Sequence, residues 1–170
     1  ATELIYISPT SNPYGNRLLW RRDNADNPFL PSISSGVDTV AYGFNPEQSK
    51  LIIGSRDGRL IIYDTLQNQI IRETQPHLYA INDLAWHPTD GRLAVTGYGL
   101  YYAMQIWQLE DNQLHDTDMR IPSLVAENVD WDATDEGSEI TISGNSSGDT
   151  VDIFNFGIID GESYETITYS

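Results

Sequence analysis

Histidine side chains are the first candidates for chemistry in this sequence, because imidazole can act as an acid, a base or a metal ligand. His77, His87 and His115 are the only three in the chain. None has a second histidine or a carboxylate at ligand spacing on an expected helix, so the pattern does not favour zinc. We expect His77 to be a structural hydrogen-bond partner and His87 to lie in a turn before Pro88.

A run of carboxylates is the second candidate. Its members are Asp130, Asp132, Asp135, Glu136 and Glu139. Carboxylate oxygens bind calcium, but this run lacks the fixed spacing and the glycine of known calcium loops. Strand alternation would place Asp130 and Asp132 on one face and Trp131 on the other. We therefore expect a solvated face and loop here, with no metal and no cofactor.

Motifs for catalysis are missing from the sequence. There is no Gly-x-Ser-x-Gly elbow, no phosphate-binding Gly-Lys-Ser/Thr loop and no His-Glu-x-x-His helix. The chain has no cysteine, which excludes disulfides, thiolate metal sites and cysteine nucleophiles. Paired carboxylates for glycoside hydrolysis stay open because acids are plentiful, but nothing singles out a pair. The sequence predicts a protein that is not an enzyme.

Charge limits the classes of partner. The chain has 25 acidic and 9 basic residues in 170, a net charge of −16. Nucleic acid and anionic membranes are disfavoured, because no basic surface is available to replace their counterions. Residues 1–110 carry −3 and residues 111–170 carry −13. The acidic last third therefore predicts a protein or peptide partner with a basic patch.

Location is less constrained than partner class. No apolar run approaches the roughly 20 residues of a membrane-spanning helix, and the first residues show no signal-peptide pattern. A cysteine-free chain can work on either side of a membrane. We expect a cytoplasmic location, with an extracellular one left open.

The elements that would position these residues repeat along the chain. One set of aromatic markers is Phe44, Trp86 and Trp131, and a second is Tyr63, Trp107 and Phe154. The first set is spaced by 42 and 45 residues and the second by 44 and 47. Each unit has room for four short β-type runs separated by turn residues, and no stretch shows sustained helical periodicity. A period in the forties with four strands per unit predicts an all-β chain of antiparallel propeller blades.

These repeats resemble WD-repeat β-propellers over about residues 38–170. The run from Asp83 to Pro88 is similar to that family's first strand and its following turn, and Ser55 to Gly58 is similar to its tight turn. Tyr63-Asp64 stands where the family has Trp-Asp, and Trp107 keeps the Trp but loses the Asp. The resemblance implies a partial structural hydrogen-bond set. Its candidates are His77, Ser55, Asp57, Thr96 and Trp107.

The repeat divides the chain into blades. We expect an incomplete first blade over residues 1–36, further blades over 37–77 and 78–123, and an acidic last blade over 124–170. Leu4–Ser8 and Arg17–Arg21 match the second and third strands of the later units, and 27–34 would be an outer strand. The first blade therefore lacks its innermost strand.

Four blades are about half of a usual WD-type ring. Such an arc could be completed by a second copy of the chain, or by a different protein with the missing blades. The sequence could also be a fragment of a longer chain, or it could close a four-bladed ring.

A tyrosine-bearing loop is the candidate binding surface. The segment from Gly97 to Tyr102 replaces a tight turn and carries three tyrosines, which are residues suited to binding surfaces. The predicted recognition patch is Tyr14, Arg56, Tyr98, Tyr101 and Tyr102. Alternatively, Tyr101 and Tyr102 start the third strand and pack between blades. The sequence thus favours a non-catalytic interaction scaffold, and the competing hypothesis is an enzyme or ligand-binding protein that uses a central channel.

Overall fold

The structure is a computed structural model of the 170-residue chain. It describes residues 5–7, 19–21, 39–67, 69–75, 78–99, 102–122, 125–134, 137–145, 152–159 and 163–169. Side chains are described within residues 40–67, 69–75, 79–98, 102–120, 126–132 and 138–144. No helix in the described part of the chain is long and apolar enough to cross a membrane.

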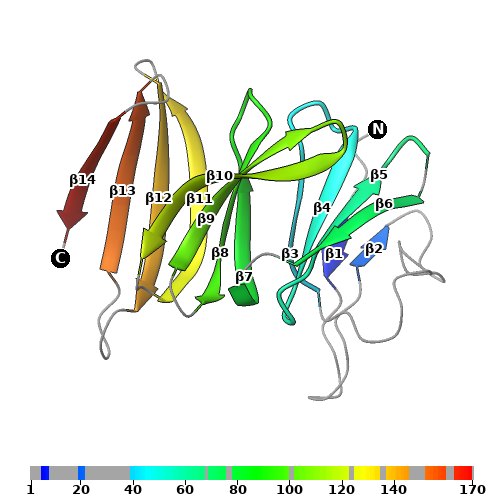
Figure 1. The fold of residues 1–170 in the computed structure, drawn as a ribbon, viewed down its shortest axis with the longest axis horizontal. Helices are drawn as coiled ribbons and strands as arrows, with labels where there is room; N and C mark the ends of the chain where they lie inside the picture. The colour runs from blue at the N-terminus through cyan, green and yellow to red at the C-terminus, as the bar shows by residue number, and fades with distance from the viewer. Residues whose placement is uncertain are drawn as a thin grey trace.

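In the described part of the chain, the strands form three four-stranded sheets and one two-stranded sheet (Figure 1). The two-stranded sheet pairs β1 (Ile5–Ile7) with β2 (Leu19–Arg21). The next sheet contains β3 (Thr39–Phe44), β4 (Lys50–Ser55), β5 (Leu60–Asp64) and β6 (Gln69–Thr74). The third contains β7 (Leu78–Trp86), β8 (Arg92–Gly99), β9 (Tyr102–Glu110) and β10 (Gln113–Pro122). The fourth contains β11 (Val125–Thr134), β12 (Gly137–Asn145), β13 (Asp152–Ile159) and β14 (Ser163–Tyr169).

Each four-stranded sheet is an antiparallel meander in chain order, which is the form of a propeller blade. The sheets stand side by side in Figure 1 and meet through their first strands. Strand β7 packs against β3 and β4, and β11 packs against β7 and β8. The all-β prediction is confirmed, and β1 and β2 fall on the two N-terminal runs that matched the later units. The expected outer strand at 27–34 lies outside the described residues.

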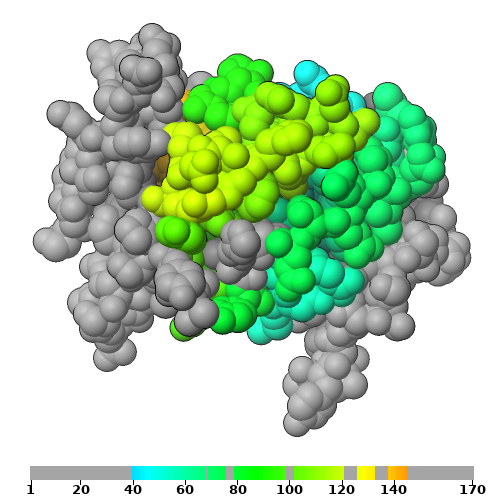
Figure 2. Space-filling model, viewed as in Figure 1, coloured from blue at the N-terminus to red at the C-terminus, as the bar shows by residue number. Residues whose placement is uncertain are grey.

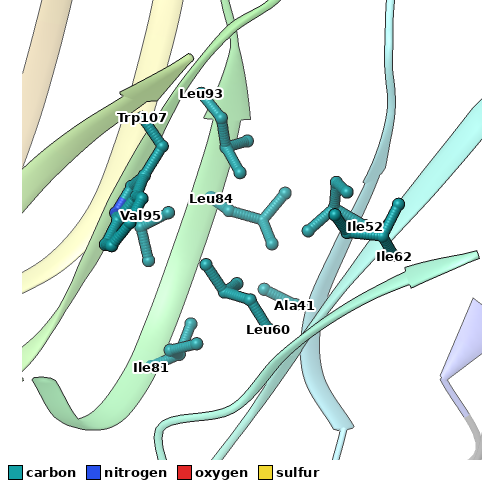
Figure 3. Close-up of a cluster of buried hydrophobic side chains, with 9 residues drawn as sticks. All are labelled: Ala41, Ile52, Leu60, Ile62, Ile81, Leu84, Leu93, Val95 and Trp107. Carbon is teal, nitrogen blue, oxygen red and sulfur yellow. The ribbon is translucent and has the colours of Figure 1, made fainter. Parts of the chain in front are cut away.

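One core of the described residues lies between the second and third sheets. Figure 3 shows Ala41, Ile52, Leu60 and Ile62 on one side, and Ile81, Leu84, Leu93, Val95 and Trp107 on the other. Glycine permits the close approach of these sheets. A Cβ on Gly54 would lie 2.7 Å from Cγ2 of Ile81, and one on Gly43 would lie 3.0 Å from Cδ1 of Leu84. A larger residue at either position would hold the two sheets apart.

In the sheet of β3 to β6, the central strands β4 and β5 are buried on both faces. The other face of this sheet holds a separate cluster of Leu51, Ile53, Ile61 and Tyr63. Because both faces are covered, β4 and β5 have continuous apolar runs in place of alternating polar residues. A further core between the third and fourth sheets contains Met104, Ile106, Val129, Trp131 and Ile140.

The outer strands of the second and third sheets meet on the face seen in Figure 2, where yellow-green residues of β10 adjoin green residues of β6. Ile71 of β6 and Leu114 of β10 both pack against the core between these sheets. The hairpin joining β9 to β10 turns at Asp111 and Asn112, whose φ values are 49° and 62°. Two successive positive φ angles are typical of the type I′ turn that fits strand twist.

Candidate protein-interaction face

The turns between second and third strands lie at one end of each sheet. This end carries the β4–β5 turn after Ser55 and the β8–β9 connection after Gly99, and it points downward in Figure 1. We call it the turn face. Because consecutive sheets run in the same direction, their turns gather on this one side of the arc.

Two exposed tyrosines lie on the adjoining ends of β7 and β8 at the turn face. Tyr98 ends β8 opposite Ala80, and its residue is 56% exposed. Tyr79 is the neighbouring residue on β7, and it is 62% exposed. The register of β7 and β8 shifts between Leu78 and Ala80, so Tyr79 is a bulged residue. The sequence-based patch contained Tyr98 and missed Tyr79, because a bulge that re-aims a side chain leaves no clear local pattern.

Gly97 lies beside this bulge and permits the close approach of β7 and β8 there. A Cβ at this position would lie 2.0 Å from the backbone oxygen of Ala80. That distance is far inside van der Waals contact, so any other residue would force the two strands apart. The glycine of the tyrosine-bearing loop therefore sets the backbone that presents Tyr79 and Tyr98.

Tyr102 is held differently from Tyr98. It is half-buried at the start of β9, with the guanidinium carbon of Arg120 5.0 Å from its ring centroid. Arg120 also forms ion pairs with Asp116 and, at 3.2 Å, with Asp118. Tyr102 is the first residue of β9, the third strand of its sheet. Tyr14 and Tyr101 lie outside the residues whose side chains are described.

The β4–β5 turn contributes charged groups to the same face. Arg56 and Asp57 are exposed, and Gly58 has a φ of 86°, which favours glycine. Arg59 donates from Nε to Asp57 at 2.8 Å and lies 3.6 Å from Glu73. Partial burial raises the pKa of Asp57, but the hydrogen bonds and charge of Arg59 outweigh it, so that pKa is below its ordinary value.

The hydrogen-bond set implied by the resemblance is dispersed. Leu93, three residues before Thr96, pairs with Trp107, so alternation puts Thr96 and Trp107 on opposite faces. The Thr96 hydroxyl donates to the backbone oxygen of Asp83 at 3.3 Å. The structure therefore does not bring Thr96 and Trp107 together. Ser55 and Asp57 belong to the second sheet, and His77 lies outside the described residues.

Two side chains of β7 form hydrogen bonds to the fourth sheet that sequence patterns did not indicate. Oδ2 of Asp83 accepts from the backbone N–H of Val129 at 3.1 Å. Asn82 donates to the backbone oxygen of Ala126 at 2.8 Å. Burial, together with the charge of Asp130, raises the pKa of Asp83, although the backbone N–H donors oppose that rise.

His87 is a buried turn residue that contacts the fourth sheet. Its Nδ1 accepts from the backbone N–H groups of Thr89 and Asp90, both at 3.2 Å. Its ring packs edge-on against Trp131 at 4.9 Å, and Arg92 lies 5.2 Å from the centroid of the same indole. Burial lowers the pKa of His87, with the Asp90 carboxylate acting in the opposite direction.

The acidic run of β11 follows the expected alternation. Asp130 and Asp132 are exposed, and Trp131 between them is buried. Among the residues that the structure describes, no three acidic or histidine side chains are grouped closely enough to hold a metal ion. Asp135 and Glu136 are outside that set.

Comparison with known proteins supports the fold. No protein-family model matches the chain. The structure is similar to the β-propeller domain of Cps50 (Swd1) from Myceliophteria thermophila, with a TM-score of 0.56 and 17% sequence identity. The match covers 80% of this chain but 40% of that chain, so this chain spans less than half its length. The chain therefore has a β-propeller fold, as the repeat period predicted.

Proposed function

We propose that this chain is a non-catalytic, WD-repeat-like propeller scaffold that binds a protein or peptide partner on its turn face. The observation that carries the proposal is the exposure of both Tyr79 and Tyr98, which lie on the adjoining ends of β7 and β8 at a bulge beside Gly97. Tyrosine offers a large and stiff contact surface, which suits recognition. Arg56 and Tyr102 extend this surface, and Tyr14 and Tyr101 are proposed members of it.

Charge supports a basic partner. Residues 124–170 contain eleven acids and no base, whereas residues 1–36 contain three of each. Exposed acids of β11 include Glu127, Asp130 and Asp132. We therefore propose that a basic patch on the partner faces the last blade and that added salt weakens the complex.

Assembly is part of the proposal, because the chain spans only part of a propeller domain similar to it. A second copy or a different protein would supply further blades. Light scattering coupled to size exclusion separates the two cases. A ring of two copies has twice the 19.1 kDa mass of the chain, and a single species at 19.1 kDa excludes the paired arcs.

The binding surface is tested with a matched pair of variants. The tagged chain and its Tyr79→Ser/Tyr98→Ser variant are used to capture partners, and each captured protein is purified and titrated by calorimetry. Leu66→Ser is the control, because Leu66 is 83% exposed in the β5–β6 turn at the opposite end of the sheet. The double variant should lose at least tenfold in affinity and the control should not. If the unmodified chain, the double variant and the control bind with equal affinity, the partner binds at a surface other than these tyrosines.

A further inference from the structure

Gln105 is a buried polar residue whose hydrogen-bonding groups are unused. It lies in the middle of β9, opposite Val95 of β8 and Arg120 of β10, and it is 0% exposed. Neither its amide nitrogen nor its amide oxygen has a hydrogen-bond partner among the described residues. Buried amides are normally satisfied, because leaving them without partners carries a large desolvation penalty.

Trp107, two residues further along β9, also has a buried polar group without a hydrogen-bond partner within the described ranges. Its indole N–H is buried and lacks an acceptor within the described part of the chain. Residues two apart on a strand share a face and have Cα atoms about 7 Å apart. Figure 3 shows Trp107 and Val95 on the side of the third sheet that faces the second. Because Val95 pairs with Gln105, the glutamine also points toward the second sheet.

Arg120 adds a third unused donor from β10. Its terminal nitrogens bind Asp116 and Asp118, but its Nε–H is buried without a partner in the described region. A bulge between Asp116 and Arg120, where Asp118 has a φ of 62°, sets this register. The strained bulge thus places Arg120 beside Gln105, which agrees with the general use of bulges to re-aim side chains.

We propose that Gln105, Trp107 and Arg120 form a binding site for one or two ordered water molecules between the second and third sheets. The three residues offer N–H donors and one carbonyl acceptor, and water can both accept and donate. Internal waters typically make two to four such bonds in polar sites. Val95 pairs with Gln105 and Leu93 pairs with Trp107, and both are fully buried apolar residues of the core between these sheets, which keeps bulk solvent out.

The site explains why polar residues persist in this core. Water bridging Gln105 and Trp107 satisfies groups that lie too far apart on one strand to bond each other well. The bridge would couple the third strand of this blade to the Arg120 bulge of the fourth. It lies on the third and fourth strands of the blade, whereas any central channel would be lined by the first strands.

Nuclear magnetic resonance of the unmodified, ¹⁵N-labelled chain tests the site directly. The Trp107 indole N–H and the Gln105 side-chain amide should show cross-relaxation with water of the sign typical of long-lived bound molecules. The Trp86 indole N–H is the internal control, because it already donates to the backbone oxygen of Gly43 at 3.0 Å. Absence of a water signal at both Trp107 and Gln105 overturns the proposal.

A substitution gives a second test, because the Tm should change in opposite directions with and without a bound water. If water bridges these groups, Gln105→Met removes its ligands and should lower the Tm by about 2–4 °C. If the groups are simply unsatisfied, the same change removes two buried polar atoms and should raise the Tm. Gln108→Met is the matched control on β9, where the side chain is partly exposed and donates to the backbone oxygen of Asp90. A higher Tm for Gln105→Met overturns the proposal, whatever the control shows.

Coupling between the residues completes the test. Trp107→Phe and Gln105→Met should be non-additive in the unfolding free energy, because each removes a ligand from the same water. Additive effects would contradict a shared site.

Discussion

Nε1 of Trp86 donates a hydrogen bond to the backbone oxygen of Gly43, 3.0 Å away on the preceding sheet. Trp131, the next aromatic of the same repeat, also reaches back to its preceding sheet, where it contacts His87 and Arg92. In the third and fourth sheets, the repeating aromatic of the first strand is therefore a contact between blades. The number of residues between successive aromatics therefore corresponds to the length of one blade in the sequence.

The Trp86 contact predicts a stability effect. Trp86→Phe removes the hydrogen bond and leaves the Gly43 carbonyl short of a donor. We expect the unfolding free energy to fall by about 1–2 kcal/mol. Urea denaturation followed by circular dichroism measures it, and an unchanged midpoint with an unchanged slope would contradict the assigned contact.

The three glycines at close contacts predict the order in which Gly→Ala substitutions destabilise the protein. An added methyl group meets the Ala80 backbone oxygen at 2.0 Å from Gly97, an Ile81 methyl at 2.7 Å from Gly54 and a Leu84 methyl at 3.0 Å from Gly43. We expect Gly97→Ala to be the most destabilising, then Gly54→Ala at about 1–3 kcal/mol, then Gly43→Ala. Thermal unfolding of the three variants gives the order, and a reversed order would show that the sheets can separate easily.

The His87 contact predicts a dependence of stability on pH. Burial lowers the pKa of this imidazole in the folded protein below its ordinary value of 6.5. The unfolded chain then binds the proton more readily, so the contribution of His87 to stability is complete above pH 6.5 and is lost as the pH falls through the folded pKa. His87→Gln should remove this component of the slope.

Asp90 and Arg92 face the same imidazole and stay in place in that comparison. Asp90 has a pKa below 3.8, because the bonds and charge of Arg92 outweigh the effect of its burial. Its own titration therefore falls at more acidic pH. Denaturation midpoints of the unmodified chain and the variant are compared from pH 5 to 8. Parallel curves would show that His87 does not titrate differently on folding.

Substitution of the exposed tyrosines should weaken partner binding and leave the stability of the fold nearly unchanged. Tyr79→Ser and Tyr98→Ser change side chains that are more than half exposed. Each should alter the unfolding free energy by no more than about 0.5 kcal/mol, as is usual for surface positions. Partner affinity should fall in the same variants, measured by calorimetry. A large loss of stability would instead assign these tyrosines a packing role.

Repeating patterns carried most of what could be predicted about the fold. The aromatic period, the β-type runs and the turn residues determined an all-β chain of blades, because each blade repeats the same local requirements. The runs at Leu51–Ser55 and Leu60–Asp64 could be assigned as strands, because their Ile-rich composition suits strands buried on both faces. The acidic composition disfavoured nucleic-acid and membrane partners, and the lack of catalytic motifs in the sequence favoured the hypothesis of a non-catalytic scaffold.

Tertiary structure decided which residues meet. It placed Thr96 and Trp107 on opposite faces, brought Asp83 to the backbone of Val129 and exposed Tyr79 beside Tyr98. Each outcome depends on a strand register, a bulge or a contact between sheets more than 40 residues apart in the sequence. A shift of one residue reverses the face on which every side chain of a strand lies. Local residue preferences specify that a segment is a strand, whereas register is set by the packing of whole sheets against one another.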